Sequence, residues 1–350
     1  MINKFITIDN RKIGLDYYPY IIAELSANHN GDLSRAIKII EMAKSAGADA
    51  IKLQTYTQDT LTIDCDKEDF KIKGGLWDKR TLYDLYTEAH MPWEWHKPLF
   101  DKAASLGLTI FSSPFDNTAV DLLEELDAPA YKIASFEAID IPLIEYVAKT
   151  GKPMIISTGM ADEEEIKEAV GAAKNAGCNQ LIILHCVSGY PAPANEYNLA
   201  TIPDITERFG VLTGLSDHTI DNTTAIASVA LGACLIEKHV TLDRSGGGPD
   251  DSFSLEKPDL LQLCRDSKVA WQARGNVSYD RKDSEKGNMI FRRSLYAVED
   301  IPKGHIFSDL NVRSIRPGYG LLPKNIGSVL GKRASVDINR GTPIDWDLIE

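Results

Sequence analysis

The chain has 350 residues, of which 43% are hydrophobic and 25% are charged, as is usual for a soluble globular protein. Its formal net charge of −13 argues against nucleic acid or an anionic membrane surface as the main partner. The sequence contains no run of roughly 18 apolar residues that could span a membrane, no secretory signal at its start and no cysteine spacing typical of disulfides. We therefore expect a cytoplasmic protein with no membrane partner.

Eight short apolar runs, rich in β-branched residues, alternate with helical patterns. The first helix begins at the N-cap Asp32 and ends before Gly47. This alternation predicts a parallel sheet, and eight units predict a closed (β/α)8 TIM barrel over residues 1–281. An open doubly wound sheet is the competing fold, but it offers a single crevice, whereas here polar groups follow all eight runs. The predicted strands are Tyr20–Leu25, Ala50–Gln54, Leu108–Ser112, Ala130–Ala134, Pro153–Ser157, Gln180–His185, Val211–Leu215 and Cys234–His239.

One insertion, Leu61–His96, is too long for a plain connection between a strand and a helix. It is rich in aromatic residues, including Trp77, Tyr86 and Trp95. We expect a packed excursion with its own helix, and a lid over the active face is the functional alternative.

The tail differs in character from the barrel. Residues 282–290 are polar and are predicted to be a linker, and residues 291–350 contain short strand patterns with Gly and Pro turns. The pattern Asp-Ile-x-basic-Gly occurs at Asp300–Gly304 and again at Asp337–Gly341, which predicts a small pseudo-symmetric β domain. A domain of this size is marginally stable alone, so we expect it to dock on another surface. A turn between the two copies presents Arg316.

Two histidines close neighbouring predicted strands, in Gly214-Leu-Ser-Asp-His218 and Leu235-Ile-Glu-Lys-His239. The C-terminal strand ends of a TIM barrel form its active face. A single histidine there is more often a hydrogen-bonded core imidazole, but two among carboxylates predict a divalent metal site. Two protein ligands with open positions suit activation of a substrate oxygen.

Two lysines, Lys52 and Lys132, lie inside strands that should be buried on both faces. A buried lysine needs an anionic partner, so the pair predicts a cradle for phosphate or carboxylate. A strand-end serine usually caps the following helix, but several beside two lysines could complete such a cradle. The other polar residues at or near strand ends are Glu24, Gln54, Ser113, Ser135, Glu137, Ser157, His185 and Ser216.

The loop Arg244–Asp251 follows the last predicted strand and contains three consecutive glycines. The glycines would allow close approach of a ligand, and Asp250 could accept hydrogen bonds from sugar hydroxyls. The alternative is a mobile surface loop without a role in binding.

Taken in order, these motifs resemble the sialic acid (nonulosonic acid) synthase family, which condenses phosphoenolpyruvate with an amino sugar. The tail from Arg292 resembles the antifreeze-like (SAF, β-clip) domain of those enzymes. The resemblance covers nearly the whole chain, and the motifs that carry it are Ile22–Gly31, Lys52–Thr55, Ser113–Phe115, Tyr131–Ser135, Ser157–Met160, Gly214–His218 and Glu237–His239.

The resemblance implies a role for each matching residue. His218 and His239 would hold Mn²⁺, or Mg²⁺ or Co²⁺ in its place, against the aldehyde oxygen of the sugar. Glu24 or Glu137 would handle the water and its proton. Arg316 would reach a neighbour's site in a domain-swapped homodimer. Phosphoenolpyruvate would be bound by Lys52, Ser113, Lys132, Ser135, Ser157 and Ser216, and the sugar by Gln54, Tyr190 and Asp250.

The insertion and the loop Gly247–Glu256 are most similar to those of family members that use a di-N-acetylated deoxy hexose. Synthases for N-acetylneuraminate typically have Asn where this chain has Ser188. The precursors of legionaminic acid and N-acetylneuraminate are the competing substrates. A metal-dependent aldolase that accepts pyruvate, or a non-enzymatic sugar-binding protein, are the alternatives outside the family.

Overall fold

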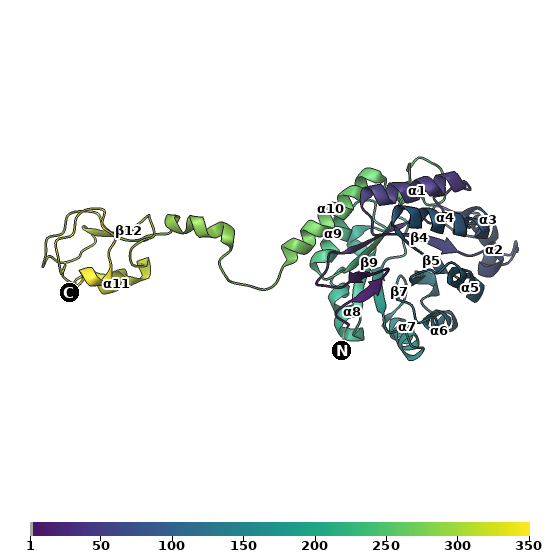
Figure 1. Ribbon diagram of the computed structural model, residues 1–350, viewed down its shortest axis with the longest axis horizontal. Coiled ribbons are helices and arrows are strands. Elements are labelled where there is room, and N and C mark those ends of the chain that lie inside the picture. The colour runs from purple at the N-terminus through teal and green to yellow at the C-terminus, as the bar shows by residue number, and fades with distance from the viewer. Residues whose placement is uncertain (1–2) are drawn as a thin grey trace. The chain divides into compact units, whose positions relative to one another are not determined.

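The computed structural model describes residues 3–350 and divides the chain into two units, Met1–Gly275 and Asn276–Glu350. Unit 1 contains a closed barrel of eight parallel strands surrounded by helices (Figure 1). The order around the barrel is β10-β3-β4-β5-β6-β7-β8-β9, so each strand pairs with its neighbours in sequence and β10 closes on β3. The predicted TIM barrel is therefore confirmed.

Each barrel strand coincides with one of the eight predicted apolar runs, with ends that differ by at most two residues. Their side chains are buried on both faces because helices cover the outside and side chains fill the inside. The strands are β3 (Tyr20–Glu24), β4 (Ala50–Thr55), β5 (Thr109–Pro114), β6 (Tyr131–Ile133), β7 (Met154–Ser157), β8 (Leu181–Cys186), β9 (Leu212–Ser216) and β10 (Leu235–His239).

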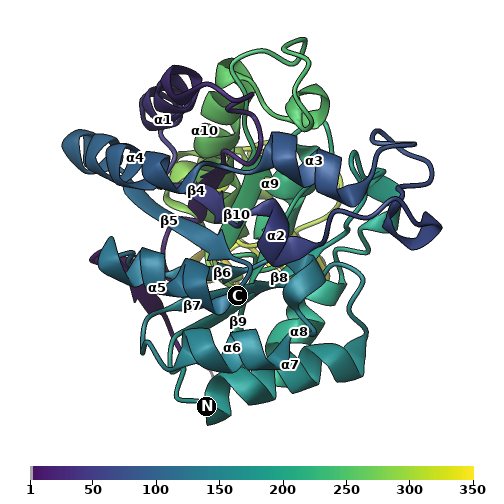
Figure 2. The same ribbon diagram turned by 90° about the vertical axis from the view of Figure 1, so that its right-hand side faces the viewer.

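The helices surround the barrel (Figure 2). Each packs an apolar stripe against it. Helix α1 begins where the Asp32 side chain accepts from Ser34 N, and it ends at Gly47, whose φ of 90° suits a residue without a Cβ. The outer helices are α1 (Leu33–Ala46), α4 (Trp93–Leu106), α5 (Asn117–Glu125), α6 (Ile141–Ala148), α7 (Glu163–Asn175), α8 (Thr201–Phe209), α9 (Thr223–Ala230) and α10 (Lys257–Arg274). Across residues 3–350 we find no helix with the length and apolarity to cross a bilayer.

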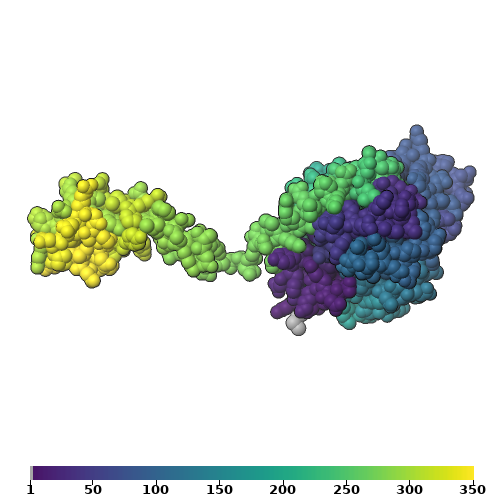
Figure 3. Space-filling view, turned by 45° about the horizontal axis from the view of Figure 1, so that its top comes forward, coloured from purple at the N-terminus to yellow at the C-terminus, as the bar shows by residue number. Residues whose placement is uncertain are grey.

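A short hairpin, β1 (Ile6–Ile8) with β2 (Arg11–Ile13), covers the N-terminal end of the barrel. Its three isoleucines join Phe111 and other strand residues in the inner core. The segment after it lies at the surface beside α10 (Figure 3). Trp271 Nε1 of α10 donates to Leu15 O of this segment at 2.9 Å. The hairpin was not predicted, because strands of three residues carry little periodicity.

The insertion begins at the last residue of α2 (Gln58–Leu61), contains the 3-10 turn η1 (Glu68–Phe70) and α3 (Leu82–Ala89), and ends inside α4. The buried His29 ring ties the end of α3 to the barrel. Its Nδ1 accepts from Gly31 N, so its Nε2 carries the proton and donates to Ala89 O at 3.3 Å. The expected helix is present, and the insertion is tied to the barrel.

Unit 2 is a small β domain with its own core, which includes Leu295, Phe307 and Ile338. Strands β11 (Ser294–Ala297) and β12 (Val312–Ile315) pair antiparallel, and short turns η6 (Pro323–Asn325), α11 (Ile326–Val329) and η7 (Trp346–Leu348) follow. The 3-10 helix η5 (Asp283–Phe291) occupies the segment predicted to be a linker.

The two copies of the repeated motif pair with each other inside unit 2. Ile301 and Ile338 exchange backbone hydrogen bonds of 2.8 and 2.9 Å. Asp337 Oδ1 accepts from Lys303 N at 2.7 Å, and Asp300 Oδ1 accepts from Arg340 N at 2.7 Å. This reciprocal exchange explains why each copy begins with Asp-Ile.

Candidate active site

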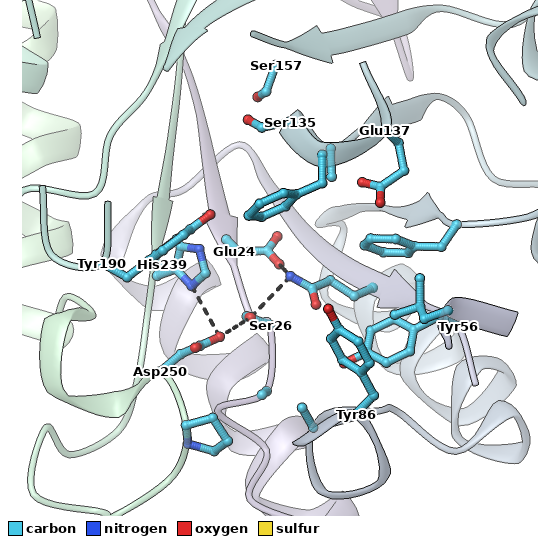
Figure 4. A pocket seen from close by; sticks show the side chains of 18 of the residues that line it. Glu24, Ser26, Tyr56, Tyr86, Ser135, Glu137, Ser157, Tyr190, His239 and Asp250 are labelled. Atoms are coloured by element: carbon cyan, nitrogen blue, oxygen red, sulfur yellow. Dashed lines mark hydrogen bonds and ion pairs between the residues drawn. The ribbon is translucent and has the colours of Figure 1, made fainter. Parts of the chain in front are cut away.

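A cavity of about 360 Å³ opens at the C-terminal ends of the barrel strands (Figure 4). Strand-end side chains form its floor, and the insertion and the loop after β10 form its sides. Of the residues predicted for the site, it is lined by Glu24, Lys52, Gln54, Lys132, Ser135, Glu137, Ser157, Tyr190, Ser216, His218, His239 and Asp250.

The two lysines meet inside the barrel. Both are 2% exposed, and Lys52 Nζ donates to Ser113 Oγ at 3.0 Å. The Ser157 hydroxyl is buried without a hydrogen-bond partner, so it is free to bind a ligand. Two cations and two hydroxyls in a buried site suit a small anion.

Glu237 forms ion pairs with both lysines. Its Oε1 lies 2.7 Å from Lys132 Nζ and 3.7 Å from Lys52 Nζ. Burial alone would raise the pKa of Glu237, but Lys132 and Lys52 outweigh burial and lower it. Burial lowers the pKa of Lys132 despite Glu237, whereas carboxylates raise that of Lys52. The sequence placed Glu237 at a strand end but gave no sign that it joins both lysines.

Two carboxylates near the anion site have raised pKa values. Burial raises the pKa of Glu24 to about 7, although Lys52 Nζ lies 2.7 Å from Glu24 Oε2. Gln54 Nε2 donates to Glu24 Oε1 at 3.0 Å. Burial also raises the pKa of Glu137 to about 7, and Glu137 Oε2 has no hydrogen-bond partner. Of the two, Glu137 has the free oxygen that a base needs.

Ser135 and Ser216 lie on the side of the anion site nearer the histidines. Ser135 Oγ accepts from Gly159 N at 3.2 Å and lies 3.4 Å from Cys186 Sγ. A Cβ on Gly159 would stand 2.0 Å from Ser188 Oγ, so glycine there leaves room for both hydroxyls. Ser216 ends β9 and is 3% exposed.

The two predicted metal ligands lie together, with imidazole centroids 5.4 Å apart. His218 Nδ1 donates to Val187 O at 2.8 Å, which leaves Nε2 as the acceptor nitrogen. Burial, and then His218 and the lysines, lower the pKa of His239 well below 6.5, and its Nδ1 is buried without a hydrogen-bond partner. Burial would lower the pKa of His218, but Cys186 outweighs burial and raises it. A divalent ion binds an imidazole in its neutral form, through its unused nitrogen.

These two histidines fit a divalent metal site with open positions. Among residues 3–350, no group of three or more His, Cys, Asp or Glu side chains has metal-binding geometry. Two protein ligands leave the remaining positions to substrate and water, an arrangement that suits catalysis rather than structural closure.

The remaining side of the cavity carries Tyr190 and Asp250. The Tyr190 ring lies 4.4 Å from that of His218 and 5.4 Å from that of Phe253. Asp250 Oδ2 accepts from Ser26 Oγ and lies 3.7 Å from His239 Nδ1. Gln54 Nε2 is 3.2 Å from the same serine oxygen. Hydroxyl and amide groups of a sugar would find both donors and acceptors here.

Two of the three glycines in the loop after β10, Gly246 and Gly248, pack against protein, whereas a Cβ on Gly247 would meet no atom within 4 Å. A Cβ on Gly248 would stand 1.9 Å from Asn30 Oδ1, and one on Gly246 would stand 2.5 Å from Asp251 Oδ2. Asp251 accepts from Arg35 Nη2 at 3.0 Å and from Asn30 Nδ2 at 2.8 Å. Asp251 thus holds the loop that carries Asp250.

Three other residues that the sequence analysis singled out do not line the cavity. Ser113 is fully buried behind Lys52 and reaches the site through that lysine. His185 is half-buried and hydrogen-bonded to Tyr197 O. Arg316 is an exposed residue of unit 2, so its predicted reach into a neighbouring site stays a prediction.

Comparison with known proteins identifies relatives over both units. The model of the NeuB family matches residues 39–279, and that of the SAF domain matches residues 292–350. Pseudaminic acid synthase of Campylobacter jejuni is 48% identical over 92% of this chain and 94% of that protein. The Helicobacter pylori pseudaminic acid synthase is 42% identical over 95% and 98%. N,N'-diacetyllegionaminic acid synthase of Campylobacter jejuni is more distant, at 39% over 90% and 95%.

A solved structure of a related enzyme has a similar fold. The crystal structure of N-acetylneuraminic acid synthetase from Leptospira borgpetersenii superposes with a TM-score of 0.74 at 30% identity, and the match covers 82% of this chain and 96% of that one.

Proposed function

Because the chain belongs to the NeuB family, we propose that it is a phosphoenolpyruvate-dependent transferase that makes pseudaminic acid. Its substrates would be phosphoenolpyruvate, water and 2,4-diacetamido-2,4,6-trideoxy-β-L-altropyranose, and its second product phosphate. The observation that carries the proposal is one cavity in which two buried lysines adjoin two buried histidines. The relatives named for pseudaminic acid synthesis favour this sugar over the legionaminic acid precursor.

A divalent metal ion, most simply Mn²⁺, would supply polarisation of the sugar aldehyde oxygen, with His218 and His239 as its ligands. Lys52, Lys132 and Ser157 would hold the phosphate and carboxylate of phosphoenolpyruvate through charge-assisted hydrogen bonds. Asp250, Gln54 and Tyr190 would orient the open-chain sugar so that its C1 faces C3 of phosphoenolpyruvate.

Bond formation between C3 and the aldehyde carbon leaves positive charge at C2 of the pyruvyl unit. Glu137 would take a proton from the water that adds to C2. The resulting tetrahedral centre expels phosphate by cleavage of its C2–O bond, and its hydroxyl loses a proton to give the ketone. The alkoxide formed from the aldehyde takes up a proton to become a hydroxyl. Glu237 and Glu24 hold the lysines in place, so the electrostatic environment is formed before the reaction begins.

In solution we expect a cytoplasmic homodimer in which Arg316 of unit 2 completes the site of the partner. This expectation rests on the likeness to the family and on the small core of unit 2.

The decisive experiment measures phosphate release from phosphoenolpyruvate with Mn²⁺ and one of three sugars. These are the 2,4-diacetamido-2,4,6-trideoxy altrose, its manno counterpart and N-acetylmannosamine. Preference for the altrose supports the proposal, and preference for another sugar reassigns the product. Phosphate-independent turnover of pyruvate would instead indicate an aldolase.

A further inference from the structure

The insertion gives the cavity an apolar wall. It contributes Leu61, Ile72, Trp77, Leu82, Leu85, Tyr86 and Ala89 to the lining. None of these side chains is charged, whereas every charged side chain in the described lining comes from a barrel strand or another loop. Trp77 Nε1 already donates to Pro249 O at 3.3 Å, so the wall adds a single side-chain hydroxyl, that of Tyr86.

Aromatic packing backs this wall. Tyr56 is 3% exposed, and its ring meets those of Tyr86 and Phe115 edge-on at 5.8 and 5.1 Å. Tyr56 and Tyr86 lie across the cavity from Tyr190 and His239 (Figure 4). The cavity therefore has a polar, metal-binding side and an apolar side that face each other.

A sugar bound in this cavity has its ends in different environments. Its aldehyde end belongs beside the histidines and the anion site, where the reaction takes place. The opposite end, which carries C6, then faces the apolar wall. A methyl group there removes apolar surface from water, whereas a hydroxyl loses hydrogen bonds that the wall does not replace.

We propose that this apolar wall of the insertion is the specificity element that selects a 6-deoxy sugar. This inference rests on the proposed function. The wall discriminates against a C6 hydroxyl and excludes a C6 phosphate, because it offers no cation to either group. The insertion is thus part of the substrate site, in addition to covering the barrel.

The test compares sugars that differ only at C6, the trideoxy altrose and its 6-hydroxy analogue. For the unmodified enzyme we expect kcat/KM to favour the 6-deoxy sugar by roughly 10- to 100-fold, the range for rejection of an added hydroxyl by an apolar pocket. Ile72→Thr places a hydroxyl in the wall and should reduce this preference by about threefold or more. Leu82→Asn is the second variant, in case the first does not fold.

The matched control is Ile63→Thr, because Ile63 lies in the same insertion but is 60% exposed and outside the cavity. It should keep the full preference, and all three variants should keep the KM for phosphoenolpyruvate. Equal kcat/KM for the two sugars in the unmodified enzyme would overturn the inference and leave the proposed function standing. Failure of every di-N-acetylated sugar to release phosphate would remove the proposed function, and the inference with it.

Discussion

Lys238 Nζ lies 2.8 Å from Asp217 Oδ2, and both side chains are buried on the outer side of the barrel. The same ammonium donates to Thr219 O at 2.7 Å and to Asp221 O at 2.8 Å. Lys238 therefore fixes the segment that carries His218, while its neighbour His239 points into the cavity. Because strand side chains alternate, one dipeptide of β10 supplies one proposed metal ligand, His239, and the residue that supports the other, His218.

We predict that Lys238→Met weakens binding of Mn²⁺ by roughly 10-fold or more, because the support of a metal ligand is lost. Titration of the protein with Mn²⁺ measures this affinity directly when the free ion is followed by electron paramagnetic resonance. Leu263→Ala, a core truncation in α10, is the control for lost stability. Equal metal affinity in both variants would show that Lys238 serves the fold alone.

Lys132→Met should lower kcat/KM for phosphoenolpyruvate by about 10- to 150-fold, the equivalent of one charge-assisted hydrogen bond. The KM for the sugar should change little. Lys38→Met on the exposed side of α1 provides a control of the same chemistry. Unchanged kinetics in Lys132→Met would remove this lysine from the anion site.

Removal of divalent ions should abolish turnover, because no ion held by the two histidines would then polarise the sugar aldehyde. Binding of phosphoenolpyruvate, measured by calorimetry on the chelated protein, should persist because Lys52 and Lys132 remain. Addition of Mn²⁺ should restore the rate. Full activity after exhaustive chelation would contradict the metal site.

The pH dependence separates the two candidate bases. With a pKa of about 7, Glu137 gains its function as a base when the pH rises through 7, so kcat should rise over that interval. Glu137→Gln should lower kcat and abolish this rise, whereas Glu24→Gln should retain it. The opposite pattern would assign the base to Glu24.

The same shift has a consequence for stability. The pKa of Glu137 is about 7 in the folded protein against 4.5 as its ordinary value, so the folded state binds the proton more tightly. Stability is therefore lost as the pH rises from about 4.5 to 7. Glu137→Gln should unfold at higher urea than the unmodified protein at pH 8, with little difference at pH 4.5.

Gly248→Ala should raise the KM for the sugar and leave that for phosphoenolpyruvate unchanged. The added methyl group would displace Asn30 from Asp251 and so loosen the loop that carries Asp250. Gly247→Ala is not a matched control, because Gly247 has a φ of 80°. Gly171→Ala in α7, where no atom lies within 4 Å of the added Cβ, is suitable.

Local patterns predicted the barrel well, because its strands are apolar runs and its helices begin at residues such as Asp32. Strand ends also identified the lysines and histidines, since parallel strands bring their ends to one face. Sequence could not show that Glu237 joins Lys52 and Lys132, because that contact depends on side chains converging across the barrel. Nor could it show that Asn30 fills the space beside Gly248, which requires the closure of β10 on β3.

The hairpin β1–β2 blocks the barrel at the end away from the cavity, and this has a kinetic consequence. Its isoleucines complete a packed core that fills this end of the barrel, so reactants should enter and products should leave through the open face. Because Lys52 and Lys132 are less exposed than His239 and Asp250, a sugar seated beside the latter obstructs the way to the lysines. Turnover should therefore follow a fixed order in which phosphoenolpyruvate enters first, and a large excess of sugar should slow the enzyme.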